Sequence, residues 1–316
     1  MGLAEDIKHK ALASGFDLVG ITDASPVDAE HVELLAGWLK SGFAGQMSYL
    51  HRNFEKRVNP GRLLEDARSV ICVGLNCNPP KQQPKPSAAC SPAGRVASYA
   101  QYEDYHLFMK RELRKLVDFI ISIAGSEHKF KVCVDSAPLA ERALAARAGL
   151  GFIGKNHMLT NPKLGGQLLL GEIITNLKLK PDGPAANGCS GCDRCITACP
   201  TGALQPDGQF DANKCVSYLT IEYKGPVPSD IAEKIGDRLF GCDECVLACP
   251  YQEDAPLCAN RHFMFYEDRA ELDLRGILDL HDKDFGTRFA NSVIKRLGLE
   301  RLKRNARIVL ANITGP

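Results

Sequence analysis

The stretch CSGCDRCITACP, residues 189–200, carries four cysteines in the spacing Cys-x2-Cys-x2-Cys-x3-Cys-Pro, and CDECVLACP, residues 242–250, repeats its latter part. This spacing is typical of bacterial ferredoxins, in which three cysteines of a run bind one 4Fe–4S cluster and the fourth binds the other cluster. The second run has Leu239 where the first has Cys189, and Cys215 lies between the runs as a replacement. The chain therefore supplies eight thiolates, enough for two clusters.

If the fourth cysteine of each run crosses over, the eight ligands divide into two sets. The first cluster is then bound by Cys189, Cys192, Cys195 and Cys249, and the second by Cys199, Cys215, Cys242 and Cys245. Zinc sites use paired Cys-x2-Cys units separated by a longer loop, which does not account for the denser first run. Disulfides need an oxidising compartment, and the N-terminal sequence MGLAEDIKHK has no apolar signal segment. We therefore predict two 4Fe–4S clusters.

Length and composition favour an ordinary globular protein with more than one domain. The chain has 316 residues, of which 45% are apolar and 24% charged, and its formal net charge is +1. No apolar run reaches the roughly 20 residues that span a bilayer, so we expect no membrane association. Thirteen cysteines without a signal peptide indicate metal-bound thiolates in a reducing cytosol, and therefore a cytoplasmic protein. A net charge near zero means that any nucleic-acid contact must come from a local basic patch.

The first 180 residues alternate between strand and helix signals. Strands are expected where apolar runs occur, at 16–21, 69–75, 131–134 and 167–177. Residues 104–124 carry apolar side chains at helical spacing, with basic side chains on the other side, which predicts an amphipathic helix. Cys72 and Cys133 fall inside apolar runs, where we expect small buried hydrophobes. Alternating strands and helices favour a layered domain.

Stretches rich in proline, glycine and small residues mark the loops and boundaries of the chain. Residues 78–94 predict a surface loop, and residues 181–188 a hinge before the cysteine runs. Pro138 suits the first turn of a helix and Gly149 its end. The expected domains are a layered domain over 1–180, a ferredoxin-like domain over 181–260 and a helical segment over 261–316. The fold class is therefore α+β: an α/β-like layered domain, a bacterial ferredoxin-type two-cluster domain and a short helical C-terminus.

Several short islands outside the cysteine runs resemble one known family. They are VDSAP at 134–138, Glu141-Arg142, AGLGFIGKN at 148–156, HRN-x3-R-x2-P at 51–60, Asp104-Tyr105-His106, LGEIIT at 170–175 and C-x-SYLTIE at 215–222. In these residues the chain resembles the epoxyqueuosine reductases. The islands extend from about residue 50 to 250, in the family's order and around its cluster motif.

The resemblance implies an activity and a second cofactor. Members of the family reduce the epoxide of epoxyqueuosine to queuosine in the anticodon loop of tRNA, using two 4Fe–4S clusters and cobalamin related to that of the reductive dehalogenases. It therefore implies a cobalamin pocket in the layered domain, tRNA carrying epoxyqueuosine as substrate, and an external low-potential electron donor. The lower-axial signature Asp-x-His-x-x-Gly is absent, since Asp104-Tyr105-His106 continues Leu-Phe-Met, which fits cobalamin without a protein histidine ligand.

By its position in the resemblance, Asp135 is the proton donor. Removing an epoxide oxygen takes two electrons and two protons, and a carboxylic acid needs a raised pKa to donate near neutrality. Burial at the end of an apolar strand raises that pKa, and the dipole of a following helix lowers it. The alternative for Asp135 is an N-cap of the helix expected near Pro138. The adjacent Glu141 and Arg142 are typical of surface charges or an ion pair worth under about 1 kcal/mol, and no catalytic role is expected for them.

The resemblance also indicates residues that contact the cofactors. They are Arg57 for cobalamin, Asn156 and His157 in a loop that lines it, and Ser217 and Tyr218 between the second cluster and the corrin edge. In its charged surroundings Arg57 is equally typical of a solvated helix face, and Tyr105 and His106 are equally typical of packing at a helix start. The turn Gly149-x-Gly151-x2-Gly154 follows a helix and precedes none, so we do not read it as a dinucleotide fingerprint.

Contact with tRNA requires basic residues that bind phosphates. The candidates in the C-terminal segment are Lys295, Arg296, Arg301, Lys303, Arg304 and Arg307, followed by Lys110, Arg111, Arg114 and Lys115. Both groups are also typical of a solvated helix face. Relatives often carry a further C-terminal helical-repeat extension, and we expect the chain to end where that extension begins.

Two other functions remain as alternatives. A cobalamin-dependent reductase of the reductive-dehalogenase type characteristically carries a twin-arginine export signal, which this N-terminus lacks. A non-enzymatic ferredoxin-like electron-transfer protein leaves the islands from 134 to 156 without a purpose. We therefore expect an epoxyqueuosine reductase.

Overall fold

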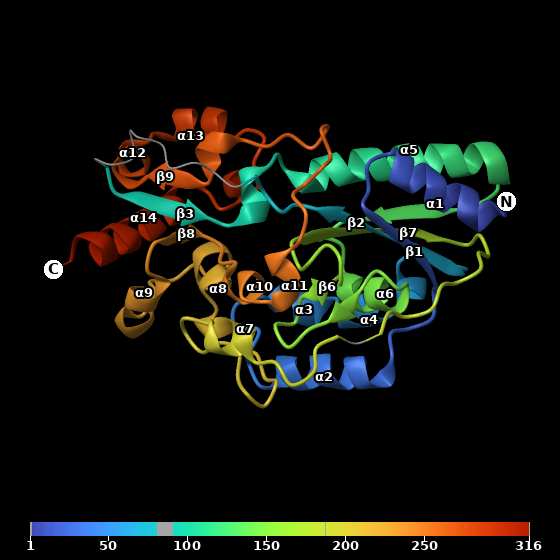
Figure 1. Ribbon diagram of the computed structural model, residues 1–316, viewed down its shortest axis with the longest axis horizontal. Helices are drawn as coiled ribbons and strands as arrows, with labels where there is room; N and C mark the ends of the chain where they lie inside the picture. The colour runs from blue at the N-terminus through green and yellow to red at the C-terminus, as the bar shows by residue number, and fades with distance from the viewer. Residues whose placement is uncertain (1, 81–90, 187, 316) are drawn as a thin grey trace.

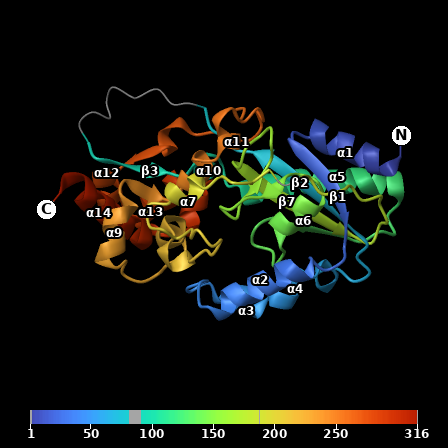
Figure 2. The ribbon, with the colours of Figure 1, turned by 60° about the horizontal axis from the view of Figure 1, so that its bottom comes forward.

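The computed structural model describes residues 2–80, 91–186 and 188–315. Figures 1 and 2 show a long molecule, with the N-terminus at one end and the C-terminus at the other. Of the predicted surface loop, residues 81–90 lie outside the described residues, and so does Cys90. The predicted α+β class is confirmed, because strands and helices alternate and the main sheet is antiparallel.

A four-stranded sheet forms the centre of the layered domain. Its order is β1 (Leu18–Asp23), β2 (Ser69–Asn76), β7 (Leu168–Thr175) and β4 (Phe130–Cys133), and every neighbouring pair is antiparallel. All four predicted strands are therefore confirmed, within a few residues at each end. β2 is buried along its whole length because it is a central strand with a helix layer on each face, and this explains its continuous apolar sequence.

Helices cover both faces of this sheet (Figure 1). On one face lie α1 (Leu3–Ala13) and α5 (Tyr105–Ala124), packed on Ile21, Ile71 and Ile173. α5 confirms the predicted amphipathic helix, and Asp104 is its N-cap. On the other face lie α6 (Glu141–Arg147), α2 (Ala29–Lys40) and α4 (Phe54–Val58), and α3 (Ser48–Arg52) leads directly into α4.

The predicted start of α6 is wrong. The helix begins at Glu141, three residues after Pro138, because the chain first turns through Ala137 and Leu139. Asp135 is therefore not its N-cap. The predicted end is confirmed, since Ala148 is the C-cap and Gly149 follows with φ +83°.

A second, smaller sheet joins the three predicted segments. Its order is β8 (Arg238–Phe240), β3 (Ala93–Val96) and β9 (Glu271–Asp273), so residues 1–180, 181–260 and 261–316 each contribute one strand. The C-terminal helices α12 (Leu274–Asp279), α13 (Asp282–Arg288) and α14 (Leu299–Thr314) belong to this end of the molecule. Their apolar side chains continue the same core as α5, which fixes the C-terminal segment against the layered domain.

The cysteine-rich segment consists of short helices linked by turns. They are α7 (Arg194–Thr197), α8 (Val216–Ile221), α9 (Ser229–Ile235), α10 (Glu244–Leu247) and α11 (Pro250–Glu253). A small hairpin of β5 (Phe152–Ile153) and β6 (Leu159–Thr160) extends from the layered domain toward this segment. The hairpin confirms that no helix follows the glycine-rich turn at 149–154.

Candidate active site and cluster module

The structure gathers the eight predicted cluster thiols into two groups. Electrostatic interactions join Cys195 and Cys249 to both Cys189 and Cys192. A second set of such interactions joins Cys245 to Cys242, Cys215 and Cys199. The grouping matches the crossover expected from the spacing, with Cys249 beside the first run. Among the described residues no three His, Cys, Asp or Glu side chains converge on a single metal ion. In a 4Fe–4S cluster each thiolate binds a different iron.

The hairpin loop at 154–157 touches both thiol groups. Lys155 donates its backbone N–H to Sγ of Cys189 at 3.4 Å and its Nζ to the carbonyl of Cys192 at 2.7 Å. Asn156 is buried and donates its side-chain amide to the carbonyl of Cys245 at 3.2 Å. Asn156 thus ties the layered domain to the second thiol group, while the sequence interpretation overlooked Lys155 as a neighbour of the first.

Ser217 and Tyr218 lie at the start of α8, and their backbone N–H groups both bond the thiol of Cys215. Tyr218 is buried, and its hydroxyl accepts the N–H of Gln46 at 2.7 Å. The approach is close enough that a Cβ on Gly45 would lie 2.3 Å from that hydroxyl oxygen. Tyr218 therefore holds the 45–46 turn beside the second thiol group.

Asp135 follows directly after β4, in a turn that exposes its carboxyl. Its φ is +51°, a left-handed conformation that residues other than glycine rarely adopt. The side chain is 55% exposed, and its Oδ2 lies 2.8 Å from Nε2 of His106. The hydroxyl of Tyr105 bonds the same carboxyl. Asp135 is thus held by α5 while it remains open to a substrate.

His106 lies between two carboxylates. Its Nδ1 is 2.7 Å from Oδ1 of Asp104, and the opposite nitrogen faces Asp135. Burial lowers the pKa of His106, but the hydrogen bonds to Asp104 and Asp135 outweigh burial, so the pKa lies above its usual value. His106, expected as an alternative to be a packing residue, is buried and bonds both carboxyls.

The pKa of Asp135 lies below its usual value. Burial raises the pKa, but the hydrogen bond and positive charge of His106 outweigh that effect. Of the two partners Asp135 is therefore the ionised one, and the raised pKa of His106 favours the proton on the imidazole. Nη1 of Arg296 also lies 2.9 Å from Nε2 of His106. An N–H donor can bond this nitrogen only once it has lost its proton, so Arg296 is positioned to stabilise neutral His106.

Two buried polar atoms on residues that interact with Arg142 have no hydrogen-bond partner in the described structure. Nε of Arg57 and Nε2 of His157 are both buried, and neither has a hydrogen bond in the described structure. Both side chains interact electrostatically with Arg142, which itself donates to the carbonyl of His157. Buried polar atoms are normally hydrogen-bonded. Arg57 therefore suits a bound group that offers an acceptor, while the ring of His157, which also bonds the backbone of Gly208, can meet a donor or an acceptor.

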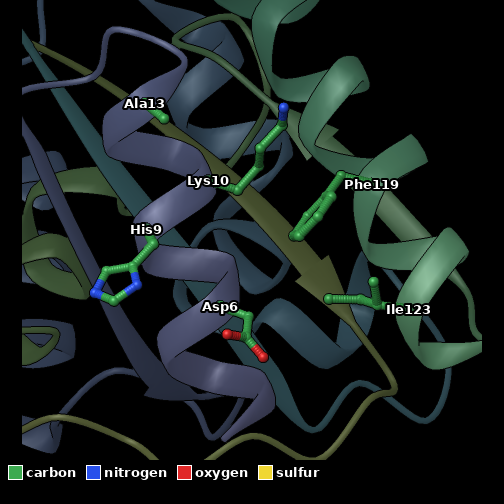
Figure 3. Close-up of a pocket in the computed structure, with 6 residues that line it drawn as sticks. All are labelled: Asp6, His9, Lys10, Ala13, Phe119 and Ile123. Atoms are coloured by element: carbon green, nitrogen blue, oxygen red, sulfur yellow. The ribbon is translucent and has the colours of Figure 1, made fainter. Parts of the chain in front are cut away.

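Two surface hollows lie away from Asp135. One, of about 330 Å³, lies between α1 and α5 and is lined by Asp6, His9, Lys10, Ala13, Phe119 and Ile123 (Figure 3). Lys10 stands over the Phe119 ring, 5.6 Å from its centre. The other, of about 470 Å³, is bordered by α2, α6 and β5. Neither contains a residue predicted for the site.

Half of the predicted C-terminal basic patch serves the fold. Arg301 donates to the carbonyl of Ile221 at 2.8 Å, and Arg304 donates to that of Leu219 at 2.7 Å. Arg296 pairs with Asp104, its Nε 3.6 Å from Oδ2, which leaves Lys295, Lys303 and Arg307 as the phosphate-binding candidates of this segment without such a contact.

Two groups of cluster-type thiols, joined through the 154–157 loop to the layered domain that carries Asp135 and His106, are the arrangement of an iron–sulfur oxidoreductase. Residues 188–252 match the family model of the 4Fe–4S double cluster binding domain, and residues 57–136 match that of the epoxyqueuosine reductase domain of unknown function 1730. An epoxyqueuosine reductase of Vibrio cholerae is 36% identical over 98% of this chain and 83% of its own length. This chain belongs to the epoxyqueuosine reductase family.

Comparison with solved structures supports the same family. The Bacillus subtilis epoxyqueuosine reductase, described with its catalytic aspartate loop swung out of the active site, superimposes with a TM-score of 0.91 and 31% identity over 98% of this chain and 81% of that one. An epoxyqueuosine reductase bound to an epoxyqueuosine-modified tRNA-Tyr stem loop gives 0.89 and 32% over the same shares. A reductive dehalogenase gives 0.50 and 15% over 98% of this chain and 36% of that one, a likeness of fold alone. Within the described residues no helix is long and apolar enough to cross a membrane.

Proposed function

We propose that this protein reduces epoxyqueuosine in the anticodon loop of tRNA to queuosine, with electrons passing from an external donor through two 4Fe–4S clusters to cobalamin. The observation that carries the proposal is the Asp104–His106–Asp135 group, a proton supply that opens onto the surface within the family's fold. The relative bound to a modified tRNA stem loop supports tRNA as substrate.

The residues present fit a bound cobalamin. Arg57 offers a buried N–H and His157 a buried ring nitrogen, both without a partner; the phosphate and amides of cobalamin offer acceptors to Arg57, and its amides offer a donor or an acceptor to His157. A guanidinium binds phosphate or carbonyl oxygens through charge-assisted hydrogen bonds. When bound, cobalamin supplies electrons to the epoxide carbons. Asn156, Ser217 and Tyr218 act through the cluster module, because their contacts go to Cys245, Cys215 and the 45–46 turn.

The chemistry of the step defines what Asp135 and His106 do. Opening the epoxide and removing its oxygen converts it to an alkene and water, and consumes two electrons and two protons. Asp135 contacts the departing oxygen and passes it two protons in turn, the first taken from Nε2 of His106 and the second from water at its exposed carboxyl. Neutral His106 then accepts an N–H from Arg296, which lowers the cost of leaving the histidine deprotonated. His106 and Arg296 thus let an acid with a lowered pKa serve as a proton donor.

Nucleoside mass analysis tests the proposal. Anaerobically reconstituted, reduced protein is incubated with epoxyqueuosine-containing tRNA, with and without cobalamin. We expect queuosine only when cobalamin is present. Absence of queuosine with both clusters intact and cobalamin bound would contradict the proposal, and would favour a reductase of the dehalogenase type. Intact clusters with no cobalamin or tRNA binding would favour an electron-transfer protein.

A further inference from the structure

Glu172 is an acid inside the main sheet. It lies in the middle of β7 and is fully buried, and neither carboxyl oxygen has a hydrogen bond of ordinary geometry in the described structure. Its register neighbours are Cys72 on β2 and Cys133 on β4. Because side chains alternate across a sheet, all three face the α6 side, where the two thiols pack with Leu144. A carboxylate is costly in such surroundings, so the position requires a protonated acid.

Glu141 lies above it, as the first residue of α6. Its Oε1 accepts the backbone N–H of Asp135 at 2.5 Å. Asp135 has the strained φ of +51° described above, and such strain persists only where the surroundings hold it. The hydrogen bond to Glu141 stabilises this strained conformation, because it fixes the peptide plane that directs the Asp135 carboxyl to His106.

The two glutamates interact with each other. Burial, followed by the charge of Asp135, raises the pKa of Glu141 to about 7. Burial, followed by the charge of Glu141, raises that of Glu172 well above its usual value. The other groups that face the pair are the cations Arg57 and Arg142, which favour a charged Glu141, and the thiols Cys72 and Cys133. Near neutrality Glu172 is therefore neutral while Glu141 changes charge.

We propose that Glu141 and Glu172 are a positioning pair, in which neutral Glu172 donates its proton toward the Glu141 carboxylate and that carboxylate holds the amide of Asp135 in its strained, site-facing conformation. Protonation of Glu141 weakens its bond to Asp135 and releases the Asp135 turn. In the Bacillus subtilis relative the catalytic aspartate loop is found swung out, so such a loop has a second position in that protein. The inference rests on the proposed function only in taking Asp135 as the group that meets the substrate.

Amide hydrogen exchange over residues 133–139 tests the pair in the cluster-loaded protein. Exchange rates, corrected for their intrinsic pH dependence, are compared between about pH 5.5 and about pH 8.5. In the unmodified protein we expect protection that falls as the pH drops through about 7. Glu141→Gln keeps the size and an acceptor oxygen but not the charge, so its protection at the upper pH is about tenfold lower and independent of pH. Glu33→Gln, on the exposed face of α2, is the control and behaves as the unmodified protein.

Two substitutions of Glu172 separate positioning from simple packing. Glu172→Gln keeps a neutral N–H donor, so the pH at which half of the amide protection over residues 133–139 is lost should not change. Glu172→Leu fills the space without a donor, so the pKa of Glu141 rises and release occurs at a higher pH. Unchanged protection in Glu141→Gln, or equal midpoints in Glu172→Leu and Glu172→Gln, would overturn the inference.

The exchange measurement needs no tRNA, so its outcome is distinct from that of the proposed function. Turnover of epoxyqueuosine-containing tRNA is measured on the same variants, and we expect kcat to follow the protection while KM for tRNA changes less than about twofold. Release near pH 7 without any queuosine formation would leave the pair standing and contradict the proposed function. Queuosine formation without pH-dependent protection would support the proposed function and contradict the positioning pair.

Discussion

The imidazole of His106 is 4% exposed and the carboxylate of Asp135 is 55% exposed, and 2.8 Å separates Nε2 of the first from Oδ2 of the second. In the proposed function, the proton is stored inside the protein on His106 and passed to Asp135 at the surface. Asp104 fixes the far nitrogen of the ring at 2.7 Å, so the stored proton faces Asp135.

Replacing His106 is expected to change the pH dependence of turnover. Because its pKa lies above 6.5, single-turnover rates of the unmodified protein should decline as the pH rises through that pKa. His106→Gln should lose at least about 10²-fold in rate and show no such decline. His128→Gln, on a residue away from this group, is the control. A decline at the same pH in His106→Gln would contradict the assignment.

The same contact predicts a pH-dependent contribution to stability. The folded pKa of His106 is raised, so its stabilising contribution is complete below about pH 6.5 and is lost as the pH rises through the folded value. The difference in Tm between the unmodified protein and His106→Gln should therefore shrink from about pH 6 to about pH 9. A constant difference would show that only packing is lost.

Lys155 is expected to tune the first cluster. Its ammonium bonds the carbonyl of Cys192 and its backbone N–H bonds Sγ of Cys189. A nearby positive charge favours the reduced, more negative cluster. Lys155→Gln should therefore make the reduction potential of that cluster more negative by roughly some tens of millivolts. A redox titration followed by electron paramagnetic resonance measures this shift. Exposed Lys163→Gln should not shift it.

Arg57 is expected to bind cobalamin. With a buried Nε that has no partner, Arg57→Gln should weaken cobalamin binding about tenfold in an absorbance titration of the cluster-loaded protein. Arg52→Gln, on an exposed residue of α3, is the control. Equal affinities would remove Arg57 from the cofactor site.

The central strands could be predicted from the sequence because burial on both faces produces long apolar runs. β2 and β7 were both expected, and both are found with small shifts of their ends. The start of α6 could not be predicted, because Pro138 is suited equally to a helical first turn and to the irregular turn that precedes Glu141. Local preference cannot separate these two conformations.

The site residues were predicted from their positions in the sequence, and the contacts among their side chains could not be. Asp135 was named from its island, but its pKa depends on His106, which lies 29 residues away and is brought near only by the packing of α5 on β4. Glu141 was expected at the surface or in an ion pair, whereas its carboxyl bonds Asp135. One signal was available for Glu172: an acid in the middle of a strand that is otherwise apolar.

The most direct test of the account is the single-turnover rate of Asp135→Asn with clusters reconstituted, cobalamin bound and epoxyqueuosine-containing tRNA saturating. Asparagine keeps the size of the side chain and loses the ability to pass a proton. We predict unchanged binding of cobalamin and tRNA and a loss of about 10²- to 10⁴-fold in queuosine formation. A rate equal to that of the unmodified protein would contradict the role of Asp135, and with it the proton supply from His106.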